Sequence, residues 1–141
     1  MSMRRILKLA ATALILCAII LGCSFGVTIQ GRIDQFIADL NASSRDQLYL
    51  NLDPSLADYE ALKDPAYWDG IFPLVGVGTN YFVMNQTVDD PGTGIATVTA
   101  DIDGPAGFSG PKLVVIGLVK VGIDWMIGSI TLAGDSVVPK P

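Results

Sequence analysis

The chain has 141 residues and a formal net charge of −5; half of its residues are hydrophobic, and it contains two cysteines but no histidine. Without histidine it lacks the usual general base near neutral pH, every His-based catalytic triad and the commonest metal ligand. Its acidic balance argues against a surface that binds the phosphate backbone of nucleic acids.

The N-terminal segment has the three-part layout of a secretory signal. Arg4, Arg5 and Lys8 give it a positive start, and residues 6–21 are then almost wholly apolar. This run is shorter than the roughly 20 apolar residues of a membrane-spanning helix. An uncleaved membrane anchor is therefore the weaker interpretation. The other alternative is an ordinary secretory signal in which Cys23 has no role.

The signal ends Ile20-Leu21-Gly22-Cys23, which resembles the lipobox of bacterial lipoproteins: an aliphatic residue, a tolerant position, a small residue and a cysteine. This resemblance implies that residues 1–22 are removed and that the Cys23 thiol carries fatty acyl chains such as palmitate. It also implies a lipid anchor in the cell envelope, in the outer membrane or on the periplasmic face of the inner membrane.

The chain that follows the predicted signal has 119 residues, which is the size of one domain. It keeps six Lys/Arg against fourteen Asp/Glu, a formal net charge of −8, because three basic residues leave with the signal. Cys17 leaves with the signal too, and Cys23 is consumed by acylation. No disulfide is then possible, so a packed core has to stabilise the domain.

Helices are predicted first. After a lipidated tether over residues 23–28, apolar residues at helical spacing predict a helix over 27–40. A short second helix over 45–52 and a third helical stretch over 54–62 follow. Pro65, Gly70 and Pro73 then end the helical pattern. The residues on the buried face of the first helix are Ile29, Ile33, Phe36, Ile37 and Leu40.

Strands are predicted next. Residues 95–102 alternate cleanly, with Ala96, Val98, Ala100 and Ile102 on one face. Helices followed by antiparallel strands indicate an α+β domain with helices packed on one face of a sheet. The predicted domain covers residues 29–133, and residues 134–141 are expected to be a flexible tail. The predicted strands are 81–88, 95–102, 113–121 and 125–132, with a Gly/Pro loop over 104–111.

This element order resembles the NTF2-like, or cystatin-like, superfamily, in which N-terminal helices lie in the concave face of a strongly curved antiparallel sheet and form a cone. The last two strands carry the resemblance, with Trp125-Met126-Ile127 after a short turn. The resemblance implies dimerisation through the outer face of the sheet, which the apolar strand 113–121 would suit. Enzymes of this fold place an Asp or a His–Asp pair inside the cone, and neither maps onto a matching motif here.

Carboxylates give no catalytic or metal site in the sequence. Asp101 and Asp103 lie two apart on one strand and share a face, which fits an acid/base pair or a hard-cation site. The favoured interpretation is a solvated strand end, as it is for Asp89 and Asp90 beside a Pro-Gly turn. No catalytic residue, metal ligand or cofactor is therefore assigned.

Aromatic side chains are the better lead. They gather in the sequence around the transition from helices to strands, where a cone would have its mouth, and they suit an apolar ligand with a polar handle. The alternative is that they fill the cone themselves. The candidate ligand-pocket residues are Tyr59, Tyr67, Trp68, Phe72, Tyr81 and Trp125.

The function expected from these observations is a lipid-anchored, non-catalytic binding or interaction module of the bacterial envelope. Its partners would be the membrane, through the lipid on Cys23, and a small apolar ligand, a second copy of the chain or another envelope protein. The alternatives are a small NTF2-like enzyme that uses an Asp in the pocket, and a structural scaffold without a ligand.

Overall fold

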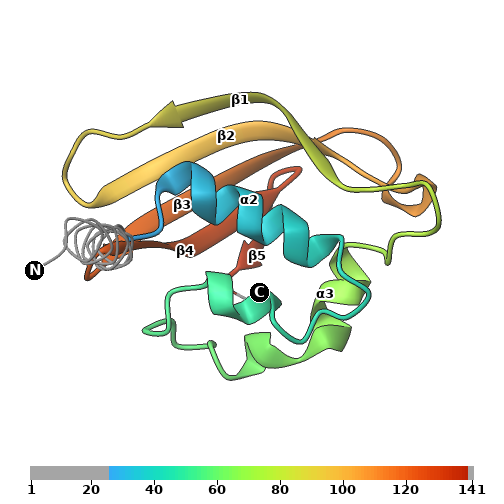
Figure 1. Ribbon diagram of the computed structural model, residues 1–141, viewed down its shortest axis with the longest axis horizontal. Helices are drawn as coiled ribbons and strands as arrows, with labels where there is room; N and C mark the ends of the chain where they lie inside the picture. Colours follow the sequence, from blue (N-terminus) through green and yellow to red (C-terminus); the bar gives the residue numbers. More distant parts are fainter. Residues whose placement is uncertain (1–25, 140–141) are drawn as a thin grey trace, which may run out of the picture.

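The computed structural model describes residues 26–139 as an α+β domain, in which two α-helices accompany an open five-stranded antiparallel sheet (Figure 1). The predicted signal peptide 1–22, Cys23 and the start of the predicted tether lie outside the described residues. The α+β prediction is confirmed. Within residues 26–139, every helix falls short of the length and apolar content that crossing a bilayer requires.

Helix α2, Ile29–Leu40, forms where the sequence predicts the first helix. Thr28 caps it, because its hydroxyl accepts a hydrogen bond from the backbone N–H of Gly31 at 3.0 Å. Its apolar face is buried through Ile33, Phe36 and Leu40. Apolar spacing and a capping residue thus agree on where this helix begins and which face it buries.

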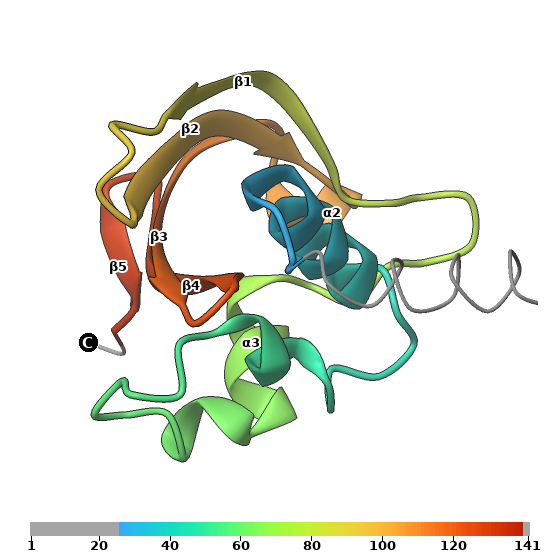
Figure 2. The same cartoon turned by 60° about the vertical axis from the view of Figure 1, so that its left-hand side comes forward.

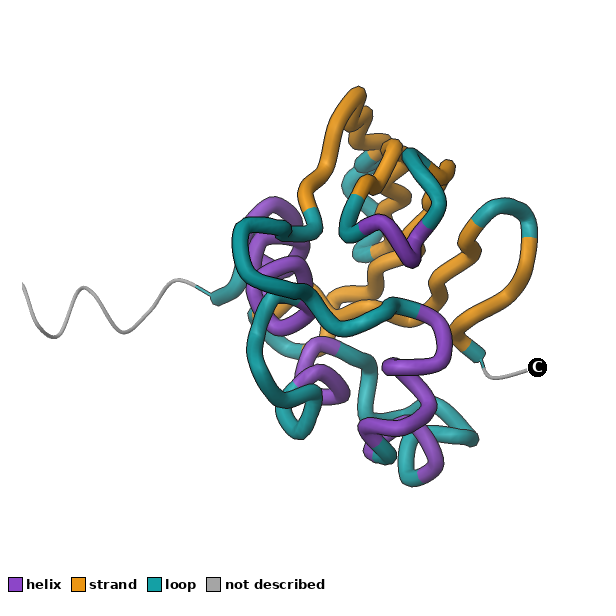
Figure 3. Tube along the Cα trace, turned by 90° about the vertical axis from the view of Figure 1, so that its right-hand side faces the viewer, coloured by secondary structure: helices purple, strands orange, loops and turns teal. Residues whose placement is uncertain are grey.

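The sheet is a simple meander, in which each strand pairs with the next along the chain. It curls around α2, which lies along its concave side (Figures 1 and 2). The helical segments gather on that one side of the sheet, apart from a 3-10 turn at Ala106–Phe108 between β2 and β3 (Figure 3). The strands are β1 Phe82–Asp89, β2 Ile95–Asp103, β3 Lys112–Val121, β4 Asp124–Leu132 and β5 Asp135–Val138.

The inward face of β2 is the one that its alternation predicts. Ala96, Val98, Ala100 and Ile102 are all buried, while the residues between them are only partly covered. Three of these four buried residues pair with buried residues of β3, as Val98 does with Ile116, and Ile102 pairs with Lys112 at the end of the strand. The core therefore lies between the concave face of the sheet and the helices.

The segment between α2 and the sheet differs from its prediction. The predicted second helix over 45–52 is only a 3-10 turn at Leu48–Asn51, and the third stretch reduces to a 3-10 turn at Ala61–Lys63. The helical pattern does not end at Pro65, because α3, Pro65–Ile71, begins there. Proline suits a first helical position, and the Asp64 side chain accepts from the backbone N–H of Ala66 at 3.0 Å.

The structure forms a fifth strand where the sequence predicts a flexible tail. Ala133 and Gly134 both have positive φ and make a tight turn, which returns β5 along β4. Val137 and Val138 are buried there. The neighbouring strand and the core stabilise this short strand. A run of only two apolar residues is too short to predict it from the sequence. The ordered domain therefore extends to residue 138 instead of ending at residue 133.

A buried guanidinium holds α2 onto the sheet. Arg32 donates through Nε to the Trp125 carbonyl at 2.8 Å and through Nη1 to the Asn51 side chain at 3.1 Å. Burial lowers the pKa of Arg32, while the charges of Asp124 and Asp39 raise it. These bonds satisfy the charge in place of water and fix the position of α2 relative to β4.

Candidate functional site

Three of the six predicted pocket residues lie in the core. Trp68, Phe72 and Tyr81 are at most 1% exposed. Phe72 stacks on Phe108 with ring centroids 5.9 Å apart, and Trp68 makes an edge contact with Phe36 at 6.3 Å. These rings fill the concave side of the sheet with the protein's own side chains, as the alternative interpretation of the aromatic cluster expected.

The other three residues are not brought together. Tyr59 packs edge-on against Tyr49 at 5.7 Å, with the Lys63 ammonium 5.2 Å from the Tyr59 ring centroid. Trp125 is partly buried against the core at the start of β4. Tyr67 lines a groove beside α3, whereas Tyr81 lines a different one, beside α2. The six aromatics therefore do not form one pocket.

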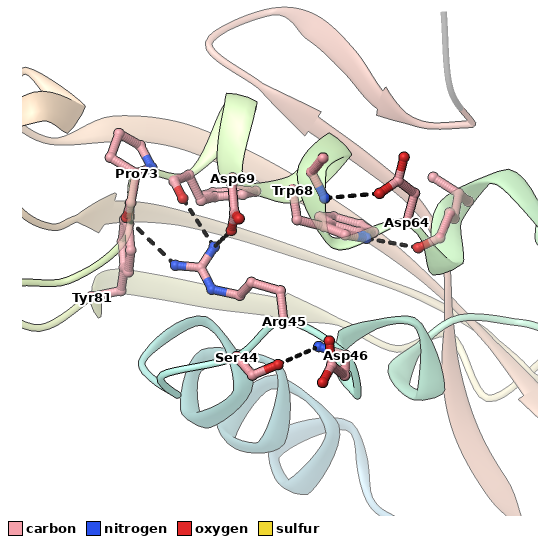
Figure 4. A network of polar contacts seen from close by, with 11 residues as sticks. Ser44, Arg45, Asp46, Asp64, Trp68, Asp69, Pro73 and Tyr81 are labelled. Atoms are coloured by element: carbon pink, nitrogen blue, oxygen red, sulfur yellow. Dashed lines mark hydrogen bonds and ion pairs between the residues drawn. The ribbon is translucent and has the colours of Figure 1, made fainter.

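Arg45 joins the loop after α2 to the end of α3 (Figure 4). This side chain is fully buried; it donates to the Phe72 carbonyl at 2.9 Å, and its Nη1 lies 3.6 Å from an Asp69 carboxylate oxygen. The Tyr81 hydroxyl donates to the adjacent Pro73 carbonyl at 2.6 Å. Burial raises the pKa of Tyr81, although Arg45 opposes this shift, so the hydroxyl remains a donor at neutral pH. The network links the buried Arg45 and Tyr81 to the end of α3, where the Asp69 side chain is 38% exposed.

A groove of about 310 Å³ lies between α3 and the β4–β5 hairpin, and we call it the α3–β5 groove. Its size is at the lower end of the range for small-molecule sites. Its walls are mostly apolar, and its polar lining residues are one tyrosine, one lysine, one aspartate and one serine. The lining residues are Tyr67, Ile71, Lys112, Leu132, Ala133, Asp135, Ser136 and Val137.

Tyr67 holds the two sides of the groove together. Its hydroxyl donates to the Val137 carbonyl at 2.6 Å and so links α3 to β5. Burial raises the pKa of Tyr67, and the charge of Asp58 adds to this shift, so the hydroxyl stays protonated at neutral pH. This hydrogen bond therefore joins the two walls of the groove.

Lys112 is the cation of the groove. Its Nζ lies 4.4 Å from the ring centroid of Phe108, in a cation–π contact. Sequence reasoning missed this residue because a lysine at the start of an apolar strand resembles an ordinary solvated strand end. Lys112 lines a groove because β5 supplies the facing wall, and the sequence analysis did not predict β5.

A second groove, also of about 310 Å³, lies between α2 and the edge strand β1. A hydrogen bond from Gln86 Nε2 to Gln30 Oε1, 2.6 Å long, crosses from one wall to the other. Asp34 also lines it, and its exposed surface is more polar than that of the α3–β5 groove. We therefore treat the α3–β5 groove as the candidate site for an apolar ligand.

The acidic pair singled out in the sequence lies on the outer face of β2. The Asp101 carboxylate accepts from the Asn85 side chain at 2.8 Å, and the Asp103 carboxylate accepts from the backbone N–H of Gly104 at 2.8 Å. Among residues 26–139, no group of three or more His, Cys, Asp or Glu side chains is placed to hold a metal ion. These partners fit the interpretation of a solvated strand end.

Comparison of the chain with protein-family models, curated proteins and solved structures gave no match. The class of protein therefore rests on fold and site alone. It is an α+β domain whose sheet curls around one helix and whose apolar groove opens between α3 and β5.

Proposed function

We propose that the chain is a lipid-anchored, non-catalytic binding module of the bacterial envelope, and that the α3–β5 groove is its ligand site. The observation that carries the binding role is the groove itself, which joins apolar walls to a few polar groups, the usual composition of a small-molecule site. The lipobox-like Ile20-Leu21-Gly22-Cys23 carries the anchoring role.

The same proposal places the domain in the NTF2-like cone fold. Support comes from the long helix α2 along the concave side of a curved antiparallel meander, with shorter helical segments beside it (Figure 2). The packing of Trp68, Phe72 and Tyr81 puts aromatic rings where a cone ligand would lie. We therefore propose the α3–β5 groove, and not the interior of the cone, as the ligand site.

Replacing Cys23 tests the anchor. We expect the full chain, expressed in a bacterial host that is fed labelled palmitate, to take up label and to remain in the membrane fraction. Cys23→Ser should take up no label, because the acylated thiol is absent, whereas the matched variant Cys17→Ser should behave like the original chain. Mass spectrometry of the mature protein should find an acylated residue 23 at its N-terminus. An unlabelled original chain, or a different N-terminus, would contradict the anchor.

The outer face of the sheet supports a second role, in contact with another copy of the chain. Leu113 and Val121 are 52% and 40% exposed at the two ends of β3, and Ile95 of β2, which pairs with Val119, is 61% exposed. Val115 and Val119 share this face, because they alternate with the buried residues of β3. An apolar stripe of this kind suits a self-complementary dimer contact.

We expect this contact to be weak, since Asp101 and Asp103 lie on the same face and would repel their counterparts. Analytical ultracentrifugation should therefore detect a dimer that strengthens as salt rises, because salt screens that repulsion while the apolar contact remains. Leu113→Lys should shift the equilibrium to monomer, whereas the exposed Val77→Lys, in the loop before β1, should not. Equal dimerisation of both variants would place the contact elsewhere.

A further inference from the structure

Lys112 differs from the other basic residues of the described chain in its surroundings. Arg32 and Arg45 are buried and hydrogen-bonded, and Lys63 pairs with Glu60 at 2.8 Å. Neither Lys112 nor Lys120 forms an ion pair with a carboxylate among residues 26–139. Of these two lysines, Lys112 is the one that lines a groove.

The position of Lys112 follows from the register of the sheet. It pairs with Ile102, whose side chain is buried, so Lys112 leaves β3 on the concave side. There it is half-buried, and its ammonium lies over the Phe108 ring. An aromatic face replaces part of its hydration, and no carboxylate among residues 26–139 forms an ion pair with it. This cation is therefore available to an incoming anion.

The rest of the groove suits a hydrocarbon chain. Ile71, Leu132 and Val137 provide apolar surface, and the Val137 carbonyl already accepts the Tyr67 hydroxyl. The one lining carboxylate, Asp135, is exposed at the start of β5. Water solvates and screens that charge, so Asp135 weakens the binding of an anion at Lys112 only modestly.

We infer that the α3–β5 groove selects short amphipathic carboxylates, with the alkyl chain against Ile71, Leu132 and Val137 and the carboxylate on the Lys112 ammonium. This inference rests on the proposed binding function and adds the ligand's chemical class. Binding is reversible and leaves both partners chemically unchanged. In this site Asp135 has an opposing role, because its negative charge limits the affinity for anions.

The test uses the full chain in lipid nanodiscs with ¹³C-labelled Ile, Leu and Val methyl groups. Octanoate, 1-octanol and octylammonium are titrated separately, and the methyl shifts of Ile71, Leu132 and Val137 report occupancy of the groove independently of partitioning into lipid. We expect octanoate to bind about tenfold more tightly than 1-octanol, as a charge-assisted hydrogen bond implies. Octylammonium should bind most weakly.

Three variants isolate the charges. Lys112→Met keeps the unbranched stem over Phe108 and should abolish the preference for octanoate over 1-octanol. Asp135→Asn should raise the affinity for octanoate about two- to fivefold, which is the usual effect of removing one exposed charge. Lys120→Met, the matched loss of an exposed lysine on the same strand, should leave octanoate binding unchanged. Unaltered methyl signals outside the groove would show that each variant is folded.

The outcomes separate this inference from the proposed function. Equal binding of octanoate and 1-octanol, unaffected by Lys112→Met, would overturn the ligand class while the groove remained a binding site. Preference for octylammonium would overturn it too and would assign selectivity to Asp135. If none of the three probes moved the groove methyls, the proposed binding function of the groove would be wrong.

Discussion

Trp68→Ala is expected to lower the free energy of unfolding by about 3–5 kcal/mol, as truncation of a large aromatic core residue usually does. Trp68 is 0% exposed and contacts Phe36 and Tyr67 edge-on. Its indole N–H donates to the Leu62 carbonyl at 2.8 Å, so the variant also leaves a buried acceptor without its donor. Urea denaturation followed by circular dichroism measures the change.

Two variants of α3 serve as controls for this prediction. Trp68→Phe keeps a ring in the core but loses the N–H, and it should cost clearly less than the alanine variant. Gly70→Ala places a methyl group where no atom lies within 4 Å, so it should stabilise α3 by about 0.5–1 kcal/mol. A loss below about 1 kcal/mol in Trp68→Ala would mean that the aromatic cluster does not hold the core together.

Arg45→Met is expected to lower the free energy of unfolding by about 3 kcal/mol, since it removes a buried, hydrogen-bonded charge. The Phe72 carbonyl would lose its donor, and Asp69 would lose its ion-pair partner (Figure 4). Methionine fills much of the same space, so the loss reports mainly the polar contacts. Urea midpoints of the original and variant chains provide the measurement.

Arg45→Lys is the informative comparison, because lysine keeps the charge but not the planar fork that reaches two groups at once. We expect an intermediate loss. Lys120→Met, which removes an exposed cation, should stay within about 0.5 kcal/mol of the original chain. An Arg45→Met variant as stable as the original would show that apolar packing alone holds α3 against the loop.

The parts of the fold that could be predicted from sequence are those whose own residues carry the pattern. The buried face of α2 and the alternation of β2 both follow from apolar spacing within one element. α3 was missed because Pro65 was interpreted as a helix breaker. In a first-turn position, with Asp64 as the cap, the same residue favours a helix.

The candidate site was harder to predict because its walls come from distant parts of the chain. Tyr67 was selected, but for its aromatic neighbours in sequence and not for its contact with Val137. Lys112 and Asp135 come to line the same groove only once β5 folds back beside β4, which depends on tertiary pairing that local propensity does not encode. Trp68 and Phe72 shared the same sequence cluster and became core instead.

The docking of Val27 determines how the domain would stand on a membrane. Val27 bonds to Asp124 and Trp125 at the start of β4, beside the β3–β4 turn. With Cys23 acylated, the four residue steps to Val27 reach at most about 14 Å, so this turn would lie close to the bilayer surface. The α3–β5 groove is at the other end of β3, about 30 Å along the strand. Under the anchoring proposed above, ligands would therefore reach the groove from the aqueous space and not directly out of the membrane.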